Sequence, residues 1–112
     1  MSIVKSVPID RFINGRTIKT SEVAIVNNED FYITNGEDCI IVRGDKATTV
    51  KLQSTTTDHV VVKALTHVVI LPDQGKVDEE YDEITCDRGA CIEFRFCGGN
   101  WYILSSDGLK QS

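Results

Sequence analysis

Four cysteines and two histidines are the side chains of this 112-residue chain best suited to hold a metal or to act as nucleophile and base. Cys86, Cys91 and Cys97 are separated by five and six residues, whereas zinc ribbons use cysteine pairs with two residues between them. Cys91 and Cys97 fall on one predicted strand and are on the order of 20 Å apart along it. They cannot share one ion within a chain, so no metal site is predicted.

The redox state of the cysteines follows from the expected compartment. The start of the chain, residues 1–10, lacks the apolar stretch of a secretion signal. We therefore expect Cys39 and the other cysteines to be thiols in a reducing cytoplasm. A disulfide between Cys86 and Cys91 is sterically feasible, because these two residues flank a predicted turn.

A hydrolytic site needs a nucleophile beside a base, and the sequence offers one weak candidate. Asp58 and His59 are adjacent, but no Ser or Cys lies in a glycine-rich turn or strand-to-helix elbow. The acidic run from Asp78 to Glu83 lacks the central glycine and the alternating ligands of a calcium loop. No phosphate-binding or dinucleotide fingerprint is present. We therefore predict no catalytic residues and no cofactor, and expect a protein that is not an enzyme.

The charge balance restricts the partners. The net charge is −5, the pI is near 4.9, and the basic residues are scattered singly along the chain. Because nucleic-acid binding depends on a cluster of cations that displaces counterions from phosphates, no nucleic-acid partner is expected. The longest apolar stretch, Val60–Leu71, is interrupted by polar residues and is too short to cross a bilayer. No membrane partner is expected either.

The elements that position these residues are predicted to be strands. Val, Ile and Thr recur in short runs separated by Asn, Gly, Pro and Asp, including the turn at Arg43-Gly44-Asp45. No window of helical length has a sustained apolar stripe, and the one plausible helical turn, in Lys76–Glu83, is acidic enough to be a loop. The expected strands are Ile3–Val7, Thr17–Thr20, Val23–Val26, Phe31–Thr34, Cys39–Arg43, Thr48–Gln53, His59–Ala64, His67–Leu71, Glu83–Thr85, Ala90–Cys97 and Trp101–Leu104.

The clearest predicted unit is a closing C-terminal hairpin. Apolar residues alternate with polar ones from Ala90 to Cys97, so one face of this strand is apolar. Gly98-Gly99-Asn100 supplies a tight turn, after which Trp101–Leu104 returns alongside. The chain is predicted to be all-β and antiparallel, as a β-sandwich or as a small β-barrel of tulip or jelly-roll type.

The N-terminal segment, residues 1–14, is apolar and contains Pro8, which suits an edge strand. It is predicted to be either an arm donated to a neighbouring subunit or an ordinary first strand. Residues 15–112 are predicted to form a single all-β domain, since no composition break divides them. The residues predicted to have an interface or structural role are Ile3, Val4, Val7, Phe12, Trp101 and Tyr102.

The order of elements in residues 48–108 resembles a module of bacteriophage virion-surface proteins, of the tail-fibre and capsid-decoration type. The strands Thr49–Leu52 and Val60–Lys63 are followed by Val68–Leu71, which ends at the Pro72-Asp73 turn. The closing part has a glycine, a small residue and an alternating apolar strand, and ends in a glycine turn before Asn100-Trp101-Tyr102. The acidic spacer and the three C-terminal cysteines depart from the pattern of this family.

The resemblance implies a β-sandwich or β-prism unit that commonly forms trimers. It implies a virion structural protein that is assembled in the host cytoplasm and has major capsid or tail proteins as partners. The expected role is capsid decoration (cement), as a homotrimer that stabilises the shell through many weak contacts. The alternative is a tail-fibre, collar or baseplate subunit that binds a receptor or glycan, with Tyr32, Tyr81 and Tyr102 as candidate contacts. A small hydrolase is the third hypothesis.

Overall fold

The computed structural model describes the backbone of residues 3–13 and 16–108 and the side chains of residues 22–108. These residues form strands and turns without a helix, so the all-β prediction is confirmed. The strands are β1 (Ile3–Ile13), β2 (Arg16–Asn27), β3 (Phe31–Ile33), β4 (Cys39–Arg43), β5 (Thr48–Leu52), β6 (His59–Ala64), β7 (Val68–Pro72), β8 (Ile84–Cys86), β9 (Cys91–Cys97) and β10 (Asn100–Asp107).

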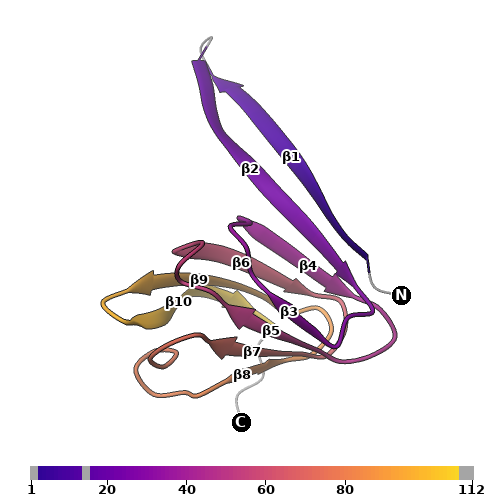
Figure 1. Ribbon diagram of the computed structural model, residues 1–112, viewed down its shortest axis with the longest axis vertical. Helices are drawn as coiled ribbons and strands as arrows, with labels where there is room; N and C mark the ends of the chain where they lie inside the picture. Colours follow the sequence, from indigo (N-terminus) through magenta and orange to yellow (C-terminus); the bar gives the residue numbers. More distant parts are fainter. Residues whose placement is uncertain (1–2, 14–15, 109–112) are drawn as a thin grey trace.

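The strands form two sheets that pack on each other like a sandwich, with a β1–β2 hairpin that extends away from them (Figure 1). The larger sheet has the order β1-β2-β4-β6-β9-β10, and the smaller has the order β3-β5-β7-β8. From β2 to β7 the chain passes from one sheet to the other after each strand. We call one strand of the larger sheet and the following strand of the smaller sheet a coil, and the three coils β2–β3, β4–β5 and β6–β7 are stacked. This is the arrangement of a short β-solenoid, in which each coil contacts mainly its neighbours.

The expectation of antiparallel sheets is wrong for the coils. The pairs β2–β4, β4–β6, β3–β5 and β5–β7 are parallel, whereas β1–β2, β6–β9, β7–β8 and β9–β10 are antiparallel. The turn within each coil leads the chain into the opposite sheet. Neighbouring strands of one sheet therefore come from successive coils and run in the same direction. The barrel alternative is also wrong, because the two mixed sheets do not close.

Successive coils are aligned where the chain turns from one sheet to the other. Asn28 has a φ of 56°, and its Oδ1 accepts a hydrogen bond from the N–H of Asp45, 2.7 Å away. Gly44, with a φ of 129°, lies so close that a Cβ there would be 2.3 Å from Asn28 Oδ1. Arg43-Gly44-Asp45 is therefore a corner of the second coil, as the turn prediction required, and only glycine fits at its centre.

Threonine hydroxyls satisfy backbone groups at these turns. Thr48 Oγ1 donates to the carbonyl of Glu29 at 2.7 Å, and Thr66 Oγ1 donates to the carbonyl of Lys46 at 3.0 Å. Thr34 Oγ1 accepts the N–H of Gln53 at 2.8 Å. Because buried backbone groups are costly when unpaired, these bonds explain why Thr34 and Thr48 are buried although they are polar.

The core lies between the two sheets and comes from strict alternation along the strands. In β5 and β6 every second residue is buried, and the residues between them are half-buried. Each large apolar side chain contributes about 1.5–3 kcal/mol when fully removed from water. The largest fully buried side chains are Trp101, Phe94, Ile40, Leu52, Ile70, Ile92, Val26, Val42, Val50, Val60, Val62 and Val68.

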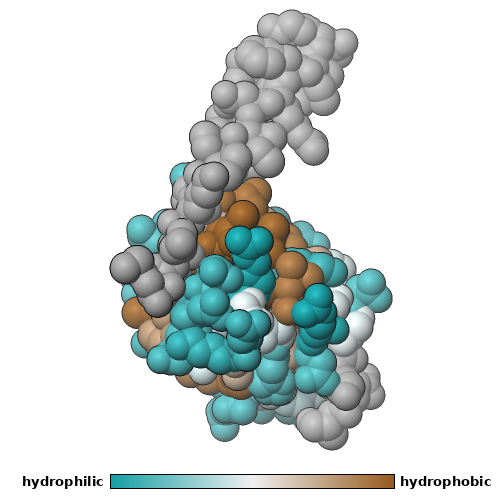
Figure 2. All heavy atoms as spheres, turned by 90° about the vertical axis from the view of Figure 1, so that its right-hand side faces the viewer, coloured by the Kyte–Doolittle hydropathy of each residue, from teal (hydrophilic) through white to brown (hydrophobic). Residues whose placement is uncertain are grey.

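Several strand boundaries differ from the sequence-based ones. Thr17–Thr20 and Val23–Val26 belong to one strand, because β2 continues without a break as the partner of β1. β9 and β10 pair through Gly98-Gly99, and β10 continues to Asp107 after a bulge between Ile103 and Ser105. Figure 2 shows a group of hydrophobic side chains on the upper part of the body, with polar side chains around them.

Candidate functional site

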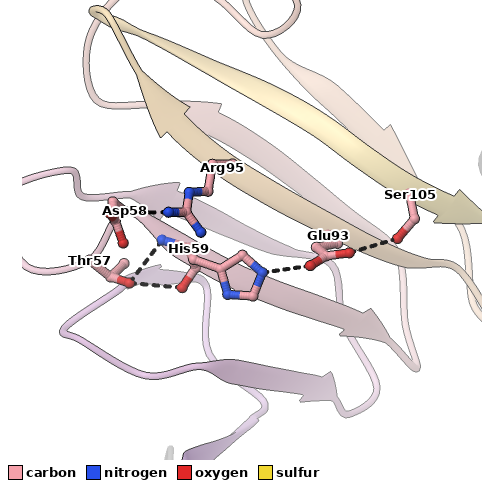
Figure 3. Close-up of polar contacts among 6 residues, drawn as sticks. All are labelled: Thr57, Asp58, His59, Glu93, Arg95 and Ser105. Carbon is pink, nitrogen blue, oxygen red and sulfur yellow. Dashed lines mark hydrogen bonds and ion pairs between the residues drawn. The ribbon is translucent and has the colours of Figure 1, made fainter.

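A polar network on the outer face of the six-stranded sheet joins β6, β9 and β10 (Figure 3). His59 Nε2 lies 2.6 Å from Glu93 Oε2, and Ser105 Oγ donates to Glu93 Oε1 at 3.0 Å. The strand register places Glu93 directly opposite Ser105, with His59 opposite Arg95. The hydrogen bond from His59, followed by that from Ser105, holds the pKa of Glu93 below its ordinary value.

This network contains the serine, histidine and carboxylate of a catalytic triad. Its hydrogen bonds do not connect the serine to the histidine, so the histidine cannot activate the serine. In a triad the hydroxyl donates to the imidazole, and the carboxylate orients the other side of that ring. Here Ser105 and His59 both bind the carboxylate of Glu93. With His59 and Glu93 about one-third exposed, the network is best described as a surface ion pair with a bound hydroxyl.

The side chains of the sequence candidates Asp58 and His59 have different partners. Asp58 lies 4.0 Å from the guanidinium of Arg95, with both side chains more than half exposed. The backbone N–H of His59 donates to Thr57 Oγ1, which in turn donates to the carbonyl of His59 (Figure 3). His67 Nδ1 is 3.0 Å from Asp87 Oδ1 in a separate exposed pair. The structure thus places the two histidines in different ion pairs.

The acidic loop between β7 and β8 is attached to β10. The N–H of Asp78 donates to the carbonyl of Trp101, and Asp78 Oδ1 accepts the N–H of Ile103 at 3.0 Å. Glu79 accepts the hydroxyl of Tyr102 at 2.8 Å. The carboxylates therefore hold the loop in place. Among the residues whose side chains are described, no group of three or more potential ligands could hold a metal ion.

Trp101 has a structural role inside the protein. It is fully buried, its ring centroid is 5.2 Å from that of Phe96, and its Nε1 donates to Asp73 Oδ1 at 3.0 Å. Asp73 Oδ2 accepts both the N–H and the hydroxyl of Ser54. Burial alone would raise the pKa of Asp73, but the hydrogen bonds from Ser54 and Trp101 bring it below its ordinary value.

The three tyrosines proposed as glycan contacts do not gather in one place. Tyr32 lies on β3, at one edge of the smaller sheet, and its hydroxyl donates to the nearly buried carboxylate of Glu37. Burial, followed by this hydrogen bond, raises the pKa of Tyr32 well above its ordinary value. Tyr102 lies on β10, at the far edge of the larger sheet, and Tyr81 is exposed in the acidic loop.

The four cysteines are free thiols. Cys86 faces the core from β8, and its burial raises its pKa to about 11. Cys91 is on the outer face of β9, since its neighbour Ile92 points into the core. The Cys86–Cys91 disulfide judged feasible from the sequence would join a core-facing thiol to one on the outer surface.

The N-terminal candidates lie on β1, at the edge of the larger sheet. The backbones of Ile3, Val4, Val7 and Phe12 pair with β2, and their side chains lie outside the described part of the structure. Sequence reasoning missed Asp73, Ser54 and Glu37. The Pro72-Asp73 turn indicated only a chain reversal, and nothing in the sequence connects these residues to their partners.

Neither a scan against protein-family models nor a search of the curated proteins gives a match for this chain. Within the described residues, no helix has the length and apolar character of a membrane span.

Proposed function

We propose that this chain is a bacteriophage virion structural protein without enzymatic activity. Its role is to decorate the capsid as a cement protein, as a homotrimer bound to the major capsid protein through many weak contacts. The proposal rests first on the resemblance of residues 48–108 to virion-surface modules.

The structural observation that supports this role best is the β1–β2 hairpin beside the stacked coils (Figure 1). A hairpin that extends beyond its own body suits a contact with another subunit. The coils supply a rigid platform, because their core side chains are buried in close-packed layers. A protein that works by holding its neighbours together needs a rigid body and an extended contact surface.

The geometry of the polar network supports the proposal that the protein has no enzymatic activity. Ser105 does not contact His59, and both bind Glu93. The arrangement provides neither an activated nucleophile nor a base directed at one.

A tail-fibre, collar or baseplate appendage that binds a receptor or glycan is the second candidate. One observation favours it. Tyr81 is 45% exposed in the acidic loop, next to Glu80 and Asp82 in the sequence. An exposed aromatic ring beside carboxylates offers a stacking surface and hydrogen-bond acceptors to a sugar.

Quantitative mass spectrometry of gradient-purified particles, produced from the genome that encodes the chain, tests both candidates. A copy number comparable to that of the major capsid protein supports decoration. A copy number comparable to that of the tail proteins supports an appendage. Particles that lack the chain while their other structural proteins are present would overturn both.

A further inference from the structure

The outer part of the β1–β2 hairpin has no second layer. The contacts of β2 with the body begin at Glu22, whose carbonyl accepts the N–H of Asp38, and its pairing with β4 begins at Val23↔Cys39. Within the described backbone, residues 16–21 of β2 therefore pair with β1 alone. Figure 1 shows this part of the hairpin extending away from both sheets. An isolated two-stranded hairpin is marginally stable in water, because it has nothing against which to bury an apolar face.

The apolar residues in the hairpin sequence favour contact with a protein partner over contact with water. Residues 8–21 include four large apolar residues, Ile9, Phe12, Ile13 and Ile18. Apolar residues of this kind favour association, because contact with another protein removes apolar groups from water.

The first 21 residues and the rest of the chain carry net charges of opposite sign. Residues 1–21 carry Lys5, Arg11, Arg16 and Lys19 against the single acidic residue Asp10, which gives a net charge of +3. Since the whole chain has a net charge of −5, residues 22–112 carry −8. The hairpin of one copy and the body of another are therefore electrostatically complementary, and hairpin-to-hairpin or body-to-body contacts are disfavoured.

The body has an open strand edge with exposed apolar residues at β3, one end of the smaller sheet. The residues Phe31 and Ile33 are 48% and 47% exposed. The carbonyl of Asp30 and the N–H of Thr34 bond to β5. Because successive residues of a strand direct their backbone groups to opposite sides, the N–H and C=O groups of Phe31 and Ile33 face the open edge.

This edge lacks the usual protection against strand pairing. β3 contains neither the Lys nor the Pro that commonly blocks an edge. The larger sheet continues one strand further, to β1, whereas the smaller sheet ends at β3 in the part of the chain that the structure describes. At the opposite end of the larger sheet, the edge of β10 is occupied by the acidic loop through Asp78. The smaller sheet therefore has a free strand position beside β3.

We infer that the β1–β2 hairpin of one copy adds to the β3 edge of a second copy of this chain. The hairpin supplies strand backbone and positive charge, and β3 supplies unpaired backbone groups and two exposed apolar side chains. The contact is heterologous, because each copy gives a hairpin and receives one, and it generates a ring or an open chain. The inference concerns self-association and does not depend on a role in a virion.

Two variants each disable one side of the contact. Phe31→Lys with Ile33→Lys introduces charges at the β3 edge that repel a basic hairpin. Arg16→Glu with Lys19→Glu reverses the charge of the hairpin. The matched controls are Leu104→Lys with Tyr81→Lys, which changes equally exposed hydrophobic residues elsewhere, and Lys76→Glu with Arg88→Glu, which makes the same charge change on the body. Circular dichroism verifies that each variant is folded.

Sedimentation velocity is the measurement. We expect the wild type and both controls to form oligomers that dissociate as salt is raised, and each disabled variant to be monomeric. A mixture of the two disabled variants retains one intact hairpin and one intact β3 edge, so it should form a one-to-one dimer. A monomeric wild type, oligomers in both disabled variants, or a mixture that stays monomeric would each overturn the inference.

Discussion

The indole N–H of Trp101 donates to Asp73 Oδ1 across 3.0 Å, although 28 residues separate the two. The bond joins the start of β10 to the end of β7, and Asp73 also accepts two hydrogen bonds from Ser54 at the end of β5. One carboxylate thus ties the second coil, the third coil and the closing strands together. We expect this carboxylate to be a main determinant of stability at this end of the molecule.

Replacing Asp73 with Ala should lower the free energy of unfolding by about 2–3 kcal/mol, because it leaves the buried indole N–H and the N–H of Ser54 without acceptors. Urea unfolding followed by fluorescence measures this directly, since Trp101 is the single tryptophan. Asp82→Ala is the control. It removes an exposed ion pair with Lys76 and should change stability by about 0.5 kcal/mol or less. Equal effects would contradict the assigned role of Asp73.

The same carboxylate predicts how stability depends on pH. The pKa of Asp73 in the folded protein lies below its ordinary value of 3.8. Its contribution is therefore fully present above the unfolded-state pKa and is lost as the pH falls through the folded-state pKa. The pKa of Glu93 is lowered too, so its contribution to stability is also lost as the pH falls. In urea titrations below pH 4, Asp73→Asn should lose less stability on acidification than the wild type, and an identical loss would contradict the assignment.

Thiol reactivity should follow the placement of the cysteines. Cys97 is exposed and should be alkylated first, followed by the half-buried Cys91 and Cys39. Burial raises the pKa of Cys39, which favours its unreactive thiol form. Cys86 should react last, because it is buried and its pKa is about 11. Brief iodoacetamide treatment followed by peptide mass spectrometry gives the order. Early modification of Cys86 in the folded protein would show that β8 does not face the core as described.

Two glycines with left-handed backbone angles should respond differently to alanine. A Cβ at Gly89 would meet open space, so Gly89→Ala should cost only the strain of its φ of 100°, about 1–2 kcal/mol. A Cβ at Gly75 would lie 1.9 Å from the carbonyl oxygen of Gly99. Gly75→Ala must therefore also separate the β7–β8 loop from the β9–β10 turn. Thermal unfolding should show a clearly larger loss for Gly75→Ala, and equal losses would contradict the close approach of these turns.

Ser105 should be inert toward reagents for activated serines, because its hydroxyl binds Glu93 and not His59. A fluorophosphonate probe incubated with the folded protein tests this. We expect no label at Ser105, and none in His59→Ala either. Labelling of Ser105 that disappears in His59→Ala would establish an activated serine and contradict the non-enzymatic role.

The sequence predicted the strands well because alternation and turn residues are local signals. The alternating Ala90–Cys97 run and the Gly98-Gly99 turn indicated β9 and the chain reversal after it. Sheet topology was predicted poorly. The corner at Gly44 has the same residue types as a hairpin turn, but its stacking on Asn28 sends the chain into the other sheet. Whether a turn reverses a strand or changes sheets depends on contacts with the next coil, which no local pattern contains.

The candidate site was predictable only where residues are adjacent in sequence. Asp58-His59 was visible as a dipeptide, yet the partner of His59 is Glu93, which the pairing of β6 with β9 brings opposite Val61. Trp101 was expected to have an interface or structural role, and the structure places it fully buried. Its partner Asp73 belongs to a different turn. These relationships depend on strand register and appear only with the three-dimensional structure.

Cryo-electron microscopy of the particles encoded by the same genome, compared with particles from a strain that lacks this gene, tests the central proposal most directly. We predict density for the protein at repeated positions on the outer shell, absent from the deletion particles, whose shells should be less resistant to heating. Wild-type and deletion particles with identical shell and tail density would contradict a structural role in the virion.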